Sequence, residues 1–129
     1  MAARGVPTTT ELIEAVREFL RDEVMPATEG RVQFHTRVAA NVLGIVEREV
    51  ALGPEAARAH AERLSKLGVA DDAELAAEIC EGRLDDRIGE VVDAMRASTF
   101  ERLCIANPRY LHAADAARVP ADSPAATVR

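Results

Sequence analysis

The sequence predicts an all-α protein, a single-domain bundle of about five helices over residues 7–111 with a long central helix. A weakly structured, mobile Ala- and Pro-rich tail is expected over residues 112–129. Three observations predict this fold. Apolar residues recur at helical spacing in successive segments, no segment alternates as a half-buried strand does, and Pro or Gly separates the segments. The 129 residues include 34 Val, Leu, Ile, Met and Phe residues, which suits one core.

A first helix is expected over residues 10–25, after three threonines of which any can cap it, and before Pro26, which stops it. Its apolar residues fall within an arc of roughly 140° at 100° per residue, so one face is expected to be buried. That face consists of Leu12, Ile13, Val16, Phe19, Leu20 and Val24.

A second helix is expected over residues 32–52, with Gly53 and Pro54 as its stop signals. Its length of roughly 31 Å and its apolar arc of about 180° are typical of a central helix that is covered on two sides.

Three further helices complete the predicted bundle. The third begins at Pro54 and ends at Gly68, and its inward residues are expected to be Ala57, Ala61, Leu64 and Leu67. The fourth covers residues 73–81, with an aspartate cap at position 71 or 72. The last begins at residue 85 or 86, ends at Asn107, and carries Ile88, Val91, Val92, Met95 and Leu103 on one face.

Charge and composition exclude several classes of partner. The formal charge is −6, with the two signs interspersed, and there are four Phe and Tyr residues and no Trp, so nucleic acid is not expected as a ligand. No membrane partner is expected, because no run of 18 apolar residues occurs. Without an export signal the chain is expected to be cytoplasmic, with Cys80 and Cys104 as reduced thiols.

One edge of the second helix predicts a partner-binding face, which consists of Arg37, Asn41, Gly44 and Arg48. A glycine inside a helix costs about 1 kcal/mol relative to alanine, which is easier to understand if another backbone approaches there. Two arginines beside it suit a partner's acidic patch. The alternative is an ordinary solvated edge with a tolerated glycine. We predict that Arg48→Glu or Gly44→Leu weakens association.

Three polar residues interrupt apolar faces and form a candidate buried polar cluster, namely His35, Glu49 and Arg102. A buried carboxylate needs a partner, so Glu49 and Arg102 are a candidate ion pair across the bundle. The functional alternative is a cleft in which Glu49 or His35 handles a proton. A purely structural pair, or a Glu49 that reaches solvent, is the simpler interpretation.

Known catalytic motifs are absent from the sequence. It contains no phosphate-binding glycine loop, no GxSxG and no HExxH, and the three histidines are dispersed. We therefore expect no catalytic residues, no cofactor, no metal site and no autonomous enzyme.

Three stretches resemble a bacterial family of small helical proteins catalogued as a domain of unknown function: PTTTELIEAVREFLRDEVMPAT, GRVQFHTRVAANVLGIVERE and DDRIGEVVDAMRASTFERLCIANPRYL. The resemblance covers roughly residues 7–111. Its most specific parts are the central run with Phe34, Arg37, Val38, Asn41 and residues 47–49, and a C-terminal motif of Asn107, Pro108, Arg109 and Tyr110.

Proteins of this family accompany aminoglycoside-phosphotransferase-like kinases and acyl-CoA dehydrogenases. The resemblance implies a non-catalytic accessory subunit of such a kinase, acting on hydroxyacyl-CoA in short-chain acid catabolism. The sequence itself has no kinase catalytic loop, so the chemistry would belong to the partner. The alternative is a self-associating helical protein that binds a small acyl or CoA-like ligand.

Overall fold

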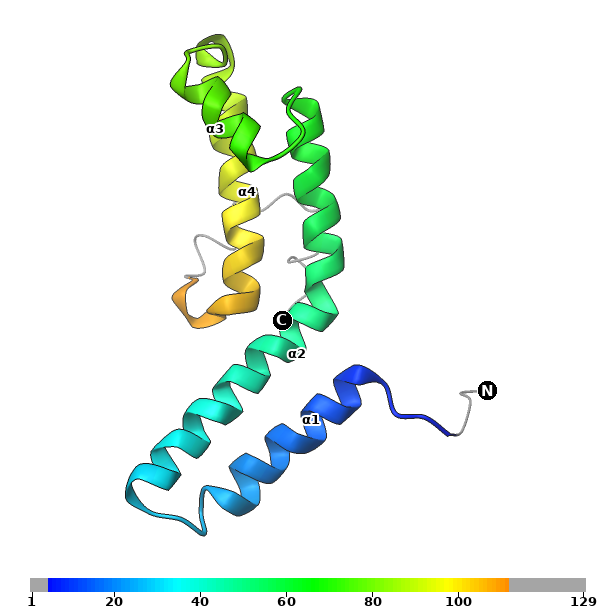
Figure 1. Cartoon of the computed structure of the whole chain (residues 1–129), viewed down its shortest axis with the longest axis vertical. Helices are drawn as coiled ribbons and strands as arrows, with labels where there is room; N and C mark the ends of the chain where they lie inside the picture. The colour runs from blue at the N-terminus through cyan, green and yellow to red at the C-terminus, as the bar shows by residue number, and fades with distance from the viewer. Residues whose placement is uncertain (1–4, 112–129) are drawn as a thin grey trace. The chain divides into compact units, whose positions relative to one another are not determined.

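The computed structural model describes residues 5–111, which are mostly helical with no strand among them, so the all-α prediction is confirmed (Figure 1). The four α-helices are α1 (Thr9–Phe19), α2 (Gly30–Lys66), α3 (Asp72–Cys80) and α4 (Ile88–Ala106). A π-helical turn, Leu20–Val24, extends α1, and short 3₁₀ turns, Asp85–Arg87 and Pro108–Tyr110, flank α4. The predicted tail, residues 112–129, lies outside the described residues.

The prediction of five helices is wrong by one, because Pro54 does not end the long helix. The expected second and third helices are one continuous helix, α2, with Pro54 inside it. A proline in a helix removes one backbone hydrogen bond and crowds the carbonyl four residues earlier, but the residues on both sides can stay helical. Each side of α2 here packs within its own compact unit, which offsets this local cost.

The chain divides into two compact units at this position, where the sequence predicts one bundle. Unit 1 extends to Ala51 and unit 2 begins at Leu52, so Pro54 lies two residues inside unit 2. The proline therefore marks the border between two units within one helix.

Unit 1 is a helical hairpin in which α1 runs beside the first part of α2 in the opposite direction (Figure 1). Thr8 caps α1, since its hydroxyl accepts from the backbone N–H of Glu11 at 3.2 Å and the Glu11 carboxylate accepts from the backbone N–H of Thr8 at 2.7 Å. The Gln33 amide, in the first turn of α2, donates to the carbonyl of Met25, which follows the π-helical turn, at 3.0 Å. A salt bridge of 2.8 Å between Arg17 and Glu47 joins the two helices.

The hairpin buries little of its own apolar surface, which corrects two expectations about burial. Of the six residues expected on the buried face of the first helix, Leu12, Val16 and Phe19 are exposed. Within unit 1, residues 32–50 of α2 have one helical neighbour, α1, so they are not covered on two sides by their own unit. Within described residues 5–51 only Thr36 is buried. The exposed large apolar residues of α2 are Val32, Phe34, Val38, Val42, Ile45, Val46 and Val50.

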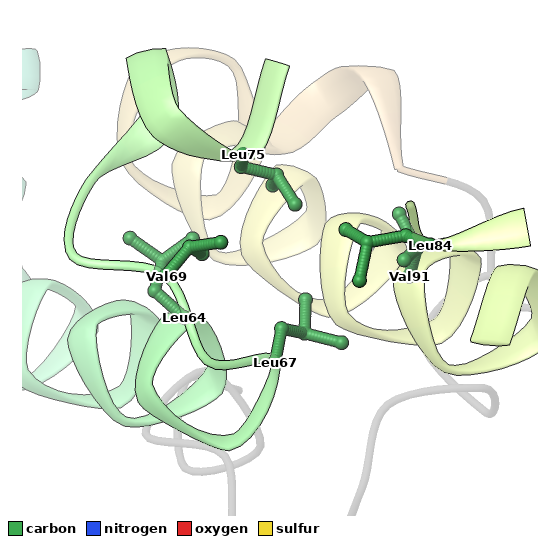
Figure 2. Close-up of a cluster of buried hydrophobic side chains, with 6 residues drawn as sticks. All are labelled: Leu64, Leu67, Val69, Leu75, Leu84 and Val91. Atoms are coloured by element: carbon green, nitrogen blue, oxygen red, sulfur yellow. The ribbon is translucent and has the colours of Figure 1, made fainter. Parts of the chain in front are cut away.

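Unit 2 contains the hydrophobic core, which the end of α2, α3 and the start of α4 build together (Figure 2). Its buried members are Leu64, Leu67, Val69, Leu75, Leu84 and Val91. Leu64 and Leu67 confirm the inward face expected there, whereas Ala57 and Ala61 are exposed.

A glycine in the left-handed region ends α2 and turns the chain toward α3. Gly68 has φ +79°, and the N–H of Val69 donates to the Leu64 carbonyl at 3.1 Å, as in a Schellman motif. Asp71 then caps α3 by accepting from the backbone N–H of Glu74 at 2.8 Å. Arg87 also donates to the Lys66 carbonyl at 2.9 Å, which satisfies the C-terminal end of α2.

The buried face of α4 is rotated from the one expected. Ile88 and Val92, expected inside, are exposed, whereas Val91 is buried as expected. The further buried residues of α4 are Ala97, Ser98, Glu101, Cys104 and Ile105. Two of these are polar, and they belong to the most connected group of side chains in unit 2.

Candidate functional site

A buried ion pair joins α2 to α4 inside unit 2. Nη1 and Nη2 of Arg63 donate to the two carboxylate oxygens of Glu101 at 2.8 and 2.7 Å. The Glu101 side chain is 2% exposed and that of Arg63 is 17% exposed. Two parallel charge-assisted bonds that are largely shielded from solvent fix the orientation of both groups. The pair therefore sets the rotation of α2 and α4 relative to each other.

A hydroxyl and an imidazole extend this pair to α3. Oγ of Ser98 accepts from Nη1 of Arg63 at 3.0 Å and lies 2.7 Å from Nδ1 of His60. Nε2 of His60 lies 2.8 Å from Oδ1 of Asp72, the first residue of α3. A neutral His60 with its proton on Nε2 satisfies every contact, since it donates to Asp72 and accepts from the Ser98 hydroxyl. We call these five residues the polar network.

The polar network contains a carboxylate, an imidazole and a hydroxyl in hydrogen-bonded order, the groups of a hydrolase triad. Its setting differs from a triad in two respects. Ser98 is buried in the middle of α4, where backbone N–H groups are bonded within the helix and cannot stabilise an oxyanion. Its hydroxyl also already accepts from Arg63. The arrangement therefore favours a structural role, in which the polar network holds α2, α3 and α4 together, over nucleophilic chemistry.

The polar network was not among the sites that the sequence predicts. The sequence does contain a signal for this side of α4, because Ser98, Glu101 and Ile105 repeat at helical spacing. This stripe is a weaker hydrophobic signal than the face of Ile88 and Val92, because its side chains are smaller or more polar.

Next to the polar network, Cys104 gives a direct test of burial. Burial, together with the charge of Glu101, raises the pKa of the Cys104 thiol above its usual range, whereas Cys80 is exposed. A thiolate is the reactive form, so we expect Cys80 to react with a maleimide at pH 7.5 at least tenfold faster than Cys104. Mass spectrometry of the singly labelled protein measures this ratio. Equal rates in the folded protein, with Cys80→Ser and Cys104→Ser as controls, would contradict the burial of Cys104.

The predicted partner-binding face lies along one edge of α2 in unit 1. Arg37 and Asn41 are exposed, and Gly44 and Arg48 are half-buried. A Cβ atom at Gly44 would lie 3.4 Å from Nη1 of Arg48 and 3.9 Å from Cδ of Arg17, so its neighbours are side chains of the same hairpin. Binding of a partner at this edge stays a prediction.

Exposed apolar residues run beside this edge. Phe34, Val38 and Ile45 follow at intervals of four and seven residues on α2, and they are 59%, 42% and 36% exposed. On a helix with 100° per residue they lie within about 40° of one another and about 20° to 60° beyond Asn41. A strip with an aromatic residue and flanking arginines has the composition of a protein interface.

The candidate buried polar cluster is not buried. His35, Glu49 and Arg102 are all exposed, since α2 has only one neighbour in unit 1 and α4 turns Glu101 inward instead of Arg102. Pairing of Glu49 with Arg102 stays a prediction. His35 lies edge-on to Phe34, with ring centroids 5.4 Å apart.

The C-terminal motif forms the last described turn. Residues 107–110 are exposed, and the N–H of Tyr110 donates to the Asn107 carbonyl at 3.1 Å.

Metal sites and membrane-spanning helices are two further features to consider in the described part of the chain. Residues 5–111 contain no group of three or more His, Cys, Asp or Glu side chains that could hold a metal ion. None of the helices in this range is both long enough and apolar enough to cross a bilayer.

The fold and its side chains define a small all-helical protein built from a hairpin and a three-helix unit. The chain belongs to the DUF6285 family, described as a domain of unknown function, whose model matches residues 26–110. This confirms the expectation of a family of unknown function. No curated protein and no solved structure is significantly similar to the chain.

Proposed function

We propose that this protein is a non-catalytic accessory subunit that binds an aminoglycoside-phosphotransferase-like kinase acting on hydroxyacyl-CoA. The observation that carries the proposal is the mixed strip on the hairpin, where Phe34, Val38 and Ile45 are exposed beside Arg37 and Asn41. Side chains of this size left open on a small helical protein mark an association surface. The identity of the partner rests on the family resemblance of the sequence.

The chemistry of the strip fits a protein partner. Its apolar residues can form the centre of an interface, and Phe34 is the side chain best suited to fill a pocket there. The arginines would lie at the rim, where they can pair with carboxylates of the partner. In this arrangement the kinase supplies the catalytic groups and the hairpin stabilises it or its acyl-CoA site.

Co-expression with an aminoglycoside-phosphotransferase-like kinase of the same organism tests this proposal. We expect the two chains to purify together and the kinase to lose at least tenfold in activity on a 4-hydroxyacyl-CoA without its subunit. A kinase with full activity alone, and no complex on mixing, would refute the accessory role.

A charge reversal at the edge of the strip gives the sharper variant. Arg37→Glu should weaken binding to the kinase by at least tenfold, because it places a negative charge where we propose that the partner is acidic. Gly44→Leu is less clean, since the larger side chain meets Arg17 of the same hairpin. Arg96→Glu, an exposed position on α4, is the matched control. If Arg37→Glu, Arg96→Glu and the wild type bind the kinase with equal affinity in calorimetry, this edge is not the binding surface.

A further inference from the structure

The hairpin has a second apolar surface, which the proposed kinase contact does not use. On α1 it contains Leu12, Val16 and Phe19, which are 54%, 51% and 53% exposed and follow at intervals of four and three residues. On α2 it contains Val32, Val46 and Val50, which are 57%, 40% and 39% exposed. We call these six residues the valine face.

The two halves of the valine face lie on the same side of the hairpin. The residues that pack between the two helices are Ile13, Arg17 and Leu20 on α1 and Thr36, Ala40, Gly44 and Glu47 on α2. At 100° per residue, the α1 residues of the valine face lie about 65° to 125° from the first stripe, and the α2 residues lie about 75° to 115° from the second in the same rotational sense. In two antiparallel right-handed helices, such rotations lead to the same side of the pair. In the same rotational sense, Phe34, Val38 and Ile45 lie about 195° to 235° from the α2 packing stripe, so they belong to another surface.

The size of the valine face matches what a stable interface needs. Six side chains that are each about half exposed present on the order of 500 Å² of apolar surface. A standard interface buries about 800 Å² on each partner, of which roughly 65% is apolar when the partners are copies of one chain. A second hairpin laid on this face would therefore cover an area of the usual size.

The composition of the hairpin favours a second copy as its occupant. Residues 9–24 contain five acidic and two basic side chains, whereas residues 30–51 contain two acidic and three basic ones. A twofold arrangement that places α1 beside the α2 of the other copy brings the acidic helix next to the basic one. Residues 112–129 are a poor match for the face, since Val119 and Val128 are their only large aliphatic residues.

We propose that two copies of this chain associate through the valine face into an antiparallel four-helix bundle, with α1 of each copy beside α2 of the other. Four-helix bundles built from two hairpins bury such paired stripes in a common centre. The opposite edge of each hairpin, with Arg37 and Phe34, stays open for the kinase. This association does not depend on the kinase proposal, because the two surfaces share no residue.

Light scattering after size-exclusion chromatography tests the association on the full chain without a partner. We expect twice the chain mass of 13.9 kDa at 50 µM. Val46→Glu should give the mass of one chain at the same concentration, because it buries a charge at the centre of the bundle. Leu12→Glu repeats the test from the other helix, and Arg37→Glu is the control that should stay dimeric. Circular dichroism must show unchanged helix content in each variant.

A cross-link tests the order of the helices. The salt bridge of 2.8 Å between Arg17 and Glu47 places Val16 and Val46 at the same level of the hairpin. A mixture of Val16→Cys and Val46→Cys chains, both carrying Cys80→Ser, should form a disulfide between copies, whereas Val16→Cys alone should form at least tenfold less. A wild-type mass of one chain at every concentration would overturn the proposal, and efficient cross-linking of Val16→Cys to itself would overturn the proposed order.

Discussion

We expect Glu101→Ala to lower the free energy of unfolding by about 3 kcal/mol, because it removes a buried carboxylate that accepts two charge-assisted bonds from the half-buried Arg63. The removed side chain is 2% exposed and accepts one bond from each Nη atom of Arg63. The same change frees space beside Ser98, whose hydroxyl shares Nη1 of Arg63. Urea unfolding followed by circular dichroism measures the loss.

Two variants separate the ion pair from general effects on α4. Arg96→Ala, at an exposed position of the same helix, should change the free energy by less than about 0.5 kcal/mol. Replacing both partners, as in Arg63→Met with Glu101→Leu, should recover most of the loss, since apolar side chains of similar size do not need each other's charge. If Glu101→Ala and Arg96→Ala are equally stable, the network does not hold the unit together.

We expect Leu75→Ala to cost about 2 to 4 kcal/mol, because it opens a cavity where α3 meets the ends of α2 and α4. Leu75 is 3% exposed and is the only buried residue of α3, so this helix depends on one side chain for its place in the core. The loss should be seen as a lower urea midpoint at unchanged slope.

Ile79→Ala is the matched control for this truncation. Ile79 lies on the same helix, is 39% exposed, and loses a similar number of atoms. We expect a change below about 1 kcal/mol, since little surface returns to water. Equal losses at the two positions would mean that α3 is not docked through Leu75.

The sequence predicts the helices well because their signals are local. The Thr8 cap, the Asp71 cap and the turn at Gly68 act over a few residues, and each element begins or ends near its signal. Pro54 is the exception. Its effect on a helix depends on whether tertiary packing continues on both sides, and a local pattern does not contain that information.

The pairing of side chains in the polar network, in contrast, has no local signal in the sequence. Arg63 and Glu101 are 38 residues apart, and their contact depends on the rotation of α4 about its axis. The apolar pattern of α4 is ambiguous on this point, because large residues such as Ile88 and Val92 occur on the face that turns outward. The bidentate pair selects a rotation that hydrophobic periodicity alone did not predict.

In the hairpin, the apolar pattern predicts a buried face that unit 1 does not bury. The spacing of its apolar residues is that of a buried face, but a helix that packs within its own chain and a helix that packs against a partner have the same pattern. Leu12, Val16 and Phe19 have the spacing of a core stripe, but unit 1 leaves them exposed. Only the structure separates the two cases.

Hydroxyl-radical footprinting of two phenylalanines tests most directly whether the hairpin is an association unit with two surfaces. Phe19 lies on the valine face and is 53% exposed in a single chain, and Phe34 lies on the proposed kinase strip and is 59% exposed. In the complex with the kinase we expect both rings to be protected, with Val46→Glu releasing Phe19 alone and Arg37→Glu releasing Phe34 alone. Equal labelling of both rings in the complex and in the double variant would contradict the account.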